Sequence, residues 1–200
     1  MDNNFVMQGY DKVAEKYLKN RDQFKSIKYL DILIKRLKPG AKIIDLGCGV
    51  GIPLDRYLID KGFKVTGIDI STKQIELARR NCPQATFIVK DMSQIKNGEY
   101  QVDAVISFYA IFHIQRESHI EIFKKINSFL SLGGLILITM GSTEWEGTET
   151  NFHGTSMYWS HYDSKKNREI IERSGFDIIL DGIDISGGER HQVILARKIK

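Results

Sequence analysis

The chain has 200 residues, which is enough for one domain with a substantial hydrophobic core and hardly enough for two. Hydrophobic residues make up 42% and charged residues 27%, which is typical of a globular protein and excludes a disordered chain. The formal net charge of +4 comes from basic residues that are mixed with acids along the chain, so no basic face predicts nucleic-acid binding.

The cysteines and the apolar runs argue against a metal-binding, disulfide-rich, secreted or membrane protein. Cys48 and Cys82 lack the spacing of a zinc site or a disulfide framework, so we expect no metal. The polar N-terminus does not resemble a signal peptide, and the longest apolar run, residues 135–140, is too short to cross a bilayer. The interpretation is a cytoplasmic protein, monomeric or homodimeric, with no membrane partner.

In chain order, apolar residues at helical spacing predict two helices within residues 1–38, and Pro39 and Gly40 end the second. Short apolar strands then alternate with helices. The expected strands are residues 41–46, 64–70, 85–90, 102–108 and 135–140. The expected helices between them are residues 52–60, 71–80 and 117–130. Ser71 is placed to cap its helix, with Gln74 at the position that would complete a capping box.

The last part of the chain follows a different pattern. A helix over residues 164–174 precedes strands at 176–185 and 191–197, whose connection is too short for a parallel crossover. We therefore predict an α/β fold with a doubly wound, mostly parallel sheet of seven strands, in which the antiparallel last strand lies between the fifth and sixth. The expected organisation is one domain, with an N-terminal helical lid (1–38) and a Rossmann-like core (41–200).

A glycine-rich turn follows the first strand: Asp45-Leu46-Gly47-Cys48-Gly49-Val50-Gly51. Glycines let the backbone turn sharply and approach a ligand closely. Asp69 ends the next strand, where an acid can bind the two hydroxyls of a ribose. The pattern predicts a site for a nucleoside cofactor.

Two classes of protein share these features. A dehydrogenase favours G-x-G-x-x-G and a pyrophosphate at the helix N-terminus. This chain has G-x-G-x-G, and Asp45 before it would repel a pyrophosphate but suits a cationic amino group or sulfonium.

The whole set of motifs resembles the class I S-adenosylmethionine-dependent methyltransferases of the small-molecule type. The resemblance rests on Ile43 to Gly51, Gly67 to Ser71, Asp91-Met92, Asp103 to Ser107 and Leu130 to Leu135, in the expected order. The segment from Tyr10 to Tyr17 also resembles the lid helix of such enzymes. The resemblance implies S-adenosyl-L-methionine as cofactor and S-adenosyl-L-homocysteine as product.

The resemblance also implies roles for individual residues around the cofactor. The methionine half would lie against the glycine loop and Phe108, and the adenosine half against the ends of the second and third strands. The implied cofactor-binding residues are Tyr10, Tyr17, Asp45, Gly47, Cys48, Gly49, Gly51, Asp69, Ile70, Asp91, Met92 and Phe108.

Several of these residues have a structural alternative. Asp69 could cap the helix that follows it, and Asp91 could simply begin a turn. Tyr10 and Tyr17 could form the buried face of an amphipathic helix. Cys48 suits the loop by its small size rather than as a nucleophile.

The segment after the fourth strand, residues 107–114, should border the ligand crevice. It lacks the Asn/Asp-Pro-Pro-aromatic motif of adenine-N6 and glutamine methylases, which favours another acceptor. His113 is a candidate general base or a packed histidine. Tyr109 is a candidate substrate contact.

Residues 141–161 read as a long connection that contains both tryptophans. Trp145, Tyr158 and Trp159 are candidate substrate-binding residues, and His161 is a second candidate catalytic residue. Alternatively, these aromatics cover a sheet edge or form a dimer contact. We expect this segment to close over the substrate together with the Tyr10–Tyr17 helix.

The sequence thus predicts methyl transfer to a small molecule. Two alternatives stay open: a non-catalytic protein that binds S-adenosylmethionine, and an NAD(P)-dependent oxidoreductase.

Overall fold

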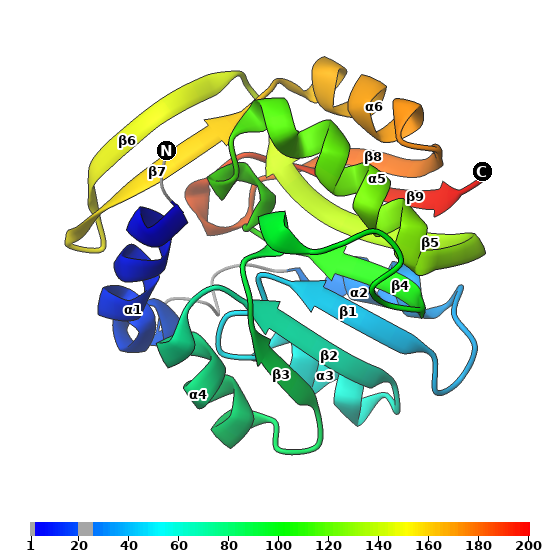
Figure 1. The fold of residues 1–200 in the computed structure, drawn as a ribbon, viewed down its shortest axis with the longest axis horizontal. Coiled ribbons are helices and arrows are strands. Elements are labelled where there is room, and N and C mark those ends of the chain that lie inside the picture. The colour runs from blue at the N-terminus through cyan, green and yellow to red at the C-terminus, as the bar shows by residue number, and fades with distance from the viewer. Residues whose placement is uncertain (1–2, 20–25) are drawn as a thin grey trace.

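The computed structural model of the chain describes residues 3–19 and 26–200, with the side chains of residues 5–14 and 26–200. Its centre is a seven-stranded sheet in the order β3-β2-β1-β4-β5-β9-β8 (Figure 1). The strands are β1 (Lys42–Leu46), β2 (Lys64–Asp69), β3 (Thr86–Val89), β4 (Val102–Ser107), β5 (Leu130–Gly141), β8 (Phe176–Asp184) and β9 (His191–Lys198).

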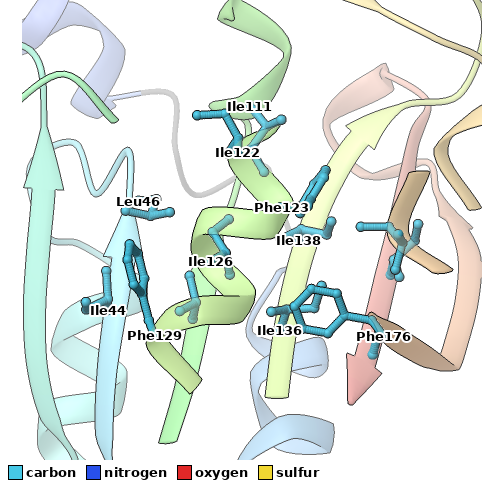
Figure 2. Close-up of a cluster of buried hydrophobic side chains, with 14 of the residues drawn as sticks. Ile44, Leu46, Ile111, Ile122, Phe123, Ile126, Phe129, Ile136, Ile138 and Phe176 are labelled. Atoms are coloured by element: carbon cyan, nitrogen blue, oxygen red, sulfur yellow. The ribbon is translucent and has the colours of Figure 1, made fainter. Parts of the chain in front are cut away.

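Side chains on the sheet alternate between two apolar layers, as the period of a strand requires. On one face, Ile44, Val105 and Ile136 pack with α5 (His119–Phe129) and α6 (Ser164–Arg173), as Figure 2 shows for α5. The other face carries Ile43 and Leu137 against α2 (Ile27–Ile34) and α3 (Leu54–Asp60). Helices on both faces explain why the strands are apolar on both sides.

The last strand confirms the predicted topology. β1, β2, β3, β4 and β5 pair in parallel, whereas β9 is antiparallel to β5 and to β8 and lies between them. The link from β8 to β9 contains only the short 3₁₀ segment η5 (Ser186–Gly188). Such a short link can join antiparallel neighbours but cannot make a parallel crossover.

Residues 141–161, which the sequence presents as one long connection, contain two strands that it did not predict. The segment forms an antiparallel hairpin of β6 (Trp145–Phe152) and β7 (Thr155–His161). Its turn places His153 at φ 51° and Gly154 at φ 93°. Two positive φ angles in succession suit a tight hairpin turn, whose twist matches that of the strands. In Figure 1 this hairpin lies beside α1 (Asn3–Lys19).

Helix α1 packs on two elements that are distant in sequence. Its Val6 forms a small apolar cluster with Met157 and Tyr158 of β7. Its Asp11 accepts hydrogen bonds from the Ser71 hydroxyl and the Lys73 backbone N–H (3.3 Å) at the start of α4 (Thr72–Asn81). No helix among the described residues is long and apolar enough to cross a membrane.

The capping prediction for α4 is half correct. The Ser71 hydroxyl accepts the Gln74 backbone N–H at 3.1 Å, so Ser71 caps the helix. The reciprocal bond of a capping box is absent: among the described residues the Gln74 side chain has no hydrogen-bond partner, and it is buried. The Ser71 backbone N–H, which a capping box would pair with Gln74, instead donates to Asp69 Oδ1 at 2.9 Å, and Asp11 from α1 adds a cap at the Lys73 N–H.

Candidate functional site

A cleft lies where β1, β2, β3 and β4 end at their carboxyl edges, the place where open α/β sheets bind ligands. It holds about 640 Å³ of empty space, part of which is open to solvent. The residues that line it are Val6, Tyr10, Gly47, Gly49, Asp69, Ile70, Gln74, Asp91, Met92, Phe108, Tyr109, Ala110, His113 and Ile114.

The glycine loop contributes two of its three glycines to the cleft. Gly47 and Gly49 line it at φ 80° and 56°, angles that favour glycine. A Cβ on Gly47 would lie 2.2 Å from the Cβ of Ala110, so this position also has no room for a side chain. Gly51 (φ 74°) packs against Phe87 instead and does not line the cleft.

Asp69 joins the glycine loop to the next helix. Its Oδ2 accepts the Gly49 N–H at 2.9 Å, and its Oδ1 accepts the Ser71 N–H at 2.9 Å. The carboxylate is therefore held in a fixed orientation at the edge of the cleft. Asp69 can cap the start of α4 and still bind a ligand, because a carboxylate offers about four acceptor positions and these two bonds use only two of them.

The ends of β2 and β3 supply the next part of the wall. Ile70 presents an apolar side chain beside Asp69. Met92 lies next to the glycine loop, because its Cε would be 3.5 Å from a Cβ on Gly47. Asp91 also lines the cleft while its Oδ1 accepts the Ser93 N–H at 2.8 Å, at the start of the 3₁₀ segment η2 (Met92–Gln94).

Two expected cofactor residues lie behind the cleft wall. Asp45 and Cys48 are buried and do not line it. Burial, followed by the nearby carboxylates Asp55 and Asp69, raises the pKa of the Cys48 thiol well above its usual value. The thiol is therefore protonated at neutral pH, which argues against a nucleophilic role.

The segment after β4 has an unusual backbone. Phe108 and Tyr109 both line the cleft, and Tyr109 has φ 57°, which is strained for a residue other than glycine. Two buried hydrogen bonds hold Tyr109 in this conformation. Its N–H donates to Thr139 Oγ1 (2.6 Å), and its hydroxyl contacts Ser26 Oγ (3.0 Å). Strained residues of this kind cluster at functional sites.

His113 meets helix α1 at the cleft. Its Nδ1 lies 2.7 Å from the Tyr158 carbonyl oxygen, which can only accept, so Nδ1 carries the proton. Its Nε2 then accepts from the Tyr10 hydroxyl, also at 2.7 Å. Burial lowers the pKa of His113 to about 4, so the ring is neutral at pH 7 with its lone pair directed at Tyr10.

The expected substrate residues other than Tyr109 do not line the cleft. Trp159 packs on the rings of His113 (4.5 Å) and Phe112 (5.1 Å). Tyr158 donates through its hydroxyl to Glu146, and Trp145 is 44% exposed on β6. The Tyr17 side chain lies outside the described residues, so its expected role is not placed.

His161, the second candidate catalytic residue, lies outside the cleft as well. Its Nδ1 lies 2.6 Å from the Thr143 carbonyl oxygen, and its ring covers Gly141, where a Cβ would be 2.0 Å from Nδ1. Burial lowers its pKa. This geometry fixes the base of the hairpin and gives His161 no direct path to the cleft.

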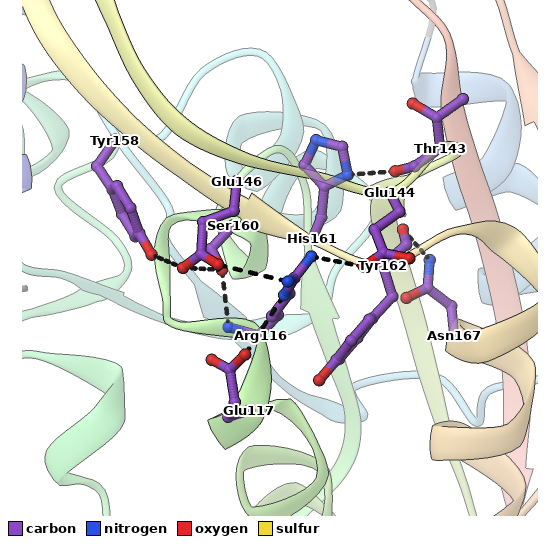
Figure 3. Close-up of polar contacts among 10 residues, drawn as sticks. All are labelled: Arg116, Glu117, Thr143, Glu144, Glu146, Tyr158, Ser160, His161, Tyr162 and Asn167. Atoms are coloured by element: carbon purple, nitrogen blue, oxygen red, sulfur yellow. Dashed lines mark hydrogen bonds and ion pairs between the residues drawn. The ribbon is translucent and has the colours of Figure 1, made fainter.

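Arg116, which begins the 3₁₀ segment η4 (Arg116–Ser118), ties the hairpin to the segment after β4 (Figure 3). Its guanidinium contacts Glu144 (2.9 Å) and Glu146 (3.5 Å), and its backbone N–H donates to Ser160 Oγ (3.0 Å). Its charge also lies 5.2 Å from the centre of the Tyr162 ring. The hairpin is thereby held next to His113.

Four lining residues were not expected from the sequence: Val6, Gln74, Ala110 and Ile114. Ala110 and Ile114 follow β4 and lie within the segment that the sequence assigned to the crevice. Val6 is one helical turn before Tyr10, a spacing that could have revealed it. Gln74 had no local signal, because its position is explained equally well by a helix cap.

The charged side chains that line the cleft are acidic. Asp69 and Asp91 line it, and no Lys or Arg does among the residues whose side chains are described. A lining of this kind favours a cationic ligand and disfavours a pyrophosphate, which would need positive groups or an open helix N-terminus.

Comparisons with known proteins agree with the fold. A family model for a methyltransferase domain matches residues 43–134. Phosphoethanolamine N-methyltransferase 1 of Arabidopsis thaliana is 33% identical over 154 residues, which are 72% of this chain and 30% of that protein. The dTDP-3-amino-3,6-dideoxy-alpha-D-glucopyranose N,N-dimethyltransferase of Streptomyces fradiae is 28% identical over 117 residues, 58% of this chain and 45% of that protein. The chain thus spans less than half the length of these two relatives.

Among solved structures, magnesium protoporphyrin IX methyltransferase of Synechocystis PCC 6803 with bound S-adenosylmethionine has the same fold. The TM-score is 0.64 at 20% identity, and the match covers 96% of this chain and 79% of that one. The sheet order with its antiparallel last strand is the Rossmann-like fold of the class I S-adenosylmethionine-dependent methyltransferases. Residues 43–134 of the chain match the methyltransferase-domain model.

Proposed function

We propose that the chain binds S-adenosyl-L-methionine in the cleft and transfers its methyl group to a small molecule, releasing S-adenosyl-L-homocysteine. The observation that carries the proposal is the joint placement of Gly47, Gly49 and the oriented Asp69 carboxylate on one wall. Glycine backbone permits close approach of the methionine half, and the carboxylate suits the ribose hydroxyls. The acidic lining favours the cationic sulfonium over the pyrophosphate of NAD.

The rest of the cleft fits the remaining parts of the cofactor. Ile70 and Met92 provide apolar surface for adenine, and Asp91 offers an acceptor for its amino group. Phe108 would lie beside the methionine half, and the buried Asp45 would act on the amino group from behind the loop. In this proposal α1 forms the lid of a single domain, whereas α2, also within residues 1–38, packs on the sheet with the core formed by residues 41–200.

When bound, the cofactor supplies an activated methyl group and its own leaving group, so the protein's main task is to align the acceptor. Tyr10 and His113 form a hydrogen-bonded pair in the cleft that can move a proton. An acceptor beside the Tyr10 hydroxyl can give its proton to the Tyr10 oxygen while the Tyr10 hydroxyl proton moves to Nε2 of His113, whose ring is neutral at pH 7. The Tyr158 carbonyl oxygen fixes the ring by accepting from Nδ1 and stabilises the imidazolium that forms.

Two features support a small acceptor. Helix α1 and the β6–β7 hairpin flank the cleft, which limits the size of what can enter. The two curated relatives described above are named for amine acceptors, a phospho-amino alcohol and an amino sugar nucleotide. An amine needs to lose one proton during methylation, which matches the Tyr10–His113 pair.

The proposal is tested by calorimetry with S-adenosylmethionine, S-adenosylhomocysteine and NAD, followed by a panel of small amines and hydroxyl compounds with S-adenosylhomocysteine release as readout. We expect binding of the first two ligands, no binding of NAD, and turnover of at least one amine. Binding of NAD alone would overturn the proposal, whereas S-adenosylmethionine binding without turnover of any compound would favour the non-catalytic alternative.

A further inference from the structure

Gln74 is a buried polar side chain in the wall of the cleft. It lies in the first turn of α4, is 1% exposed, and lines the cleft together with Asp69 and Ile70. Neither its Oε1 nor its Nε2 has a hydrogen-bond partner among the described residues. A native protein leaves few buried polar groups in this condition, because each loses its hydrogen bonds to water without replacement.

The neighbours of Gln74 do not explain the unpaired amide. Its backbone N–H is bound by Ser71 Oγ at 3.1 Å, and the Lys73 backbone N–H and the Ser71 hydroxyl are bound by Asp11. The helix cap is therefore complete without the Gln74 side chain. Packing alone does not call for an amide either, because the next buried positions of α4 are the apolar Ile75 and Ala78.

We propose that the Gln74 amide binds a ribose hydroxyl of the cofactor, next to Asp69. This inference rests on the proposed function and adds to it a residue that selects the nucleoside half. The Asp69 carboxylate can only accept hydrogen bonds, whereas the amide both donates and accepts. A vicinal diol that donates to Asp69 still offers lone pairs, and Gln74 Nε2 supplies the donor that Asp69 lacks.

The amide atoms have almost no accessible surface in the structure. Ligand entry therefore requires a rotation of the Gln74 side chain, a shift of α1, or both, since Val6 and Tyr10 of α1 line the same cleft. A bound hydroxyl would then satisfy the amide inside a dry site, where a hydrogen bond is electrostatically stronger than in water.

Replacing the amide by an apolar side chain should therefore preserve or raise the stability of the ligand-free protein and weaken its binding of the cofactor. Methionine is close to glutamine in length, is apolar, and has a similar helix propensity. The Gln74→Met variant without ligand should be at least as stable as the wild type, because an unpaired buried amide is removed. The same variant should bind S-adenosylhomocysteine about tenfold more weakly, the ordinary value of one lost hydrogen bond to a ligand.

The experiment measures urea unfolding without ligand and calorimetric affinity for S-adenosylhomocysteine in the wild type, Gln74→Met and Gln74→Leu. Gln84→Met is the matched control, because Gln84 is exposed and does not line the cleft. Competition by adenosine, 2′-deoxyadenosine and 3′-deoxyadenosine gives the group that the amide recognises. We expect the wild type to prefer adenosine over at least one deoxy analogue, and the Gln74 variants to lose that preference.

The results separate this inference from the proposed function. Wild-type protein that binds neither S-adenosylmethionine nor S-adenosylhomocysteine would overturn both. Wild-type binding with unchanged affinity in both Gln74 variants would overturn only the role of the amide. A folded Gln74→Met protein that is clearly less stable than the wild type would also count against it, because the amide would then have an internal partner.

Discussion

Acid sensitivity is expected from three buried histidines. Burial lowers the pKa of His113, His119 and His191 to about 4 in each case, against about 6.5 in the unfolded chain. The unfolded state therefore takes up more protons as pH falls, and stability is lost between about pH 6.5 and pH 4. From pH 8 to pH 5 each histidine should contribute a loss of about 2 kcal/mol, or about 6 kcal/mol together.

A loss of that size is comparable to the whole stability of an ordinary domain, so the protein should unfold near pH 5. The perturbation that isolates one contribution is His119→Gln. His119 Nε2 lies 3.1 Å from the Ile114 carbonyl oxygen, so Nε2 carries the proton. Its Nδ1 is buried with no partner among the described residues, so a second proton there would be both charged and unpaired. Glutamine can still donate to Ile114 and does not titrate.

The assay is urea unfolding of the wild type and His119→Gln at pH 8 and pH 5, with the slope on urea checked to be the same. The variant should lose about 2 kcal/mol less than the wild type between the two pH values, whatever its stability at pH 8. Equal losses in the two proteins, within about 0.5 kcal/mol, would refute the reasoning, because His119 would then titrate alike in both states.

Three further predictions concern the cleft. Gly47→Ala should abolish detectable S-adenosylmethionine binding and lower the melting temperature, because its Cβ would meet Ala110 at 2.2 Å and its φ of 80° disfavours alanine; near-wild-type calorimetry would contradict the assigned geometry. Asp69→Ala should weaken that binding by about 1–3 kcal/mol, and unchanged affinity in a folded variant would remove Asp69 from the site. Trp159→Ala should reduce turnover or raise KM through the loss of its packing on His113, with cofactor affinity almost unchanged because Trp159 does not line the cleft; wild-type kinetics would show that this packing has no role in the reaction.

The sequence by itself determined the seven-stranded sheet, its flanking helices and the location of the crevice, but not the β6–β7 hairpin. Apolar residues with the period of strands and helices, interrupted by glycine turns, predicted the sheet, its helices and the antiparallel last strand. These signals are local. A parallel strand that is buried on both faces is apolar throughout. The short link between the last two strands is itself enough to exclude a parallel crossover. The position of Gly47 directly after β1, and of Asp69 directly at the end of β2, follows from the same local pattern.

Tertiary structure alone decided which side chains meet. The Tyr10 hydroxyl and His113 Nε2 are 103 residues apart in the chain and 2.7 Å apart in space, and the hairpin carbonyl that orients His113 comes from Tyr158. The sequence pattern places Gln74 in a capping box, but in the structure Asp69 accepts the Ser71 N–H and Asp11, from a helix distant in sequence, accepts the Lys73 N–H. Local periodicity shows whether a side chain is buried. Its hydrogen-bond partners depend on how separate elements pack, and no pattern within one element records that.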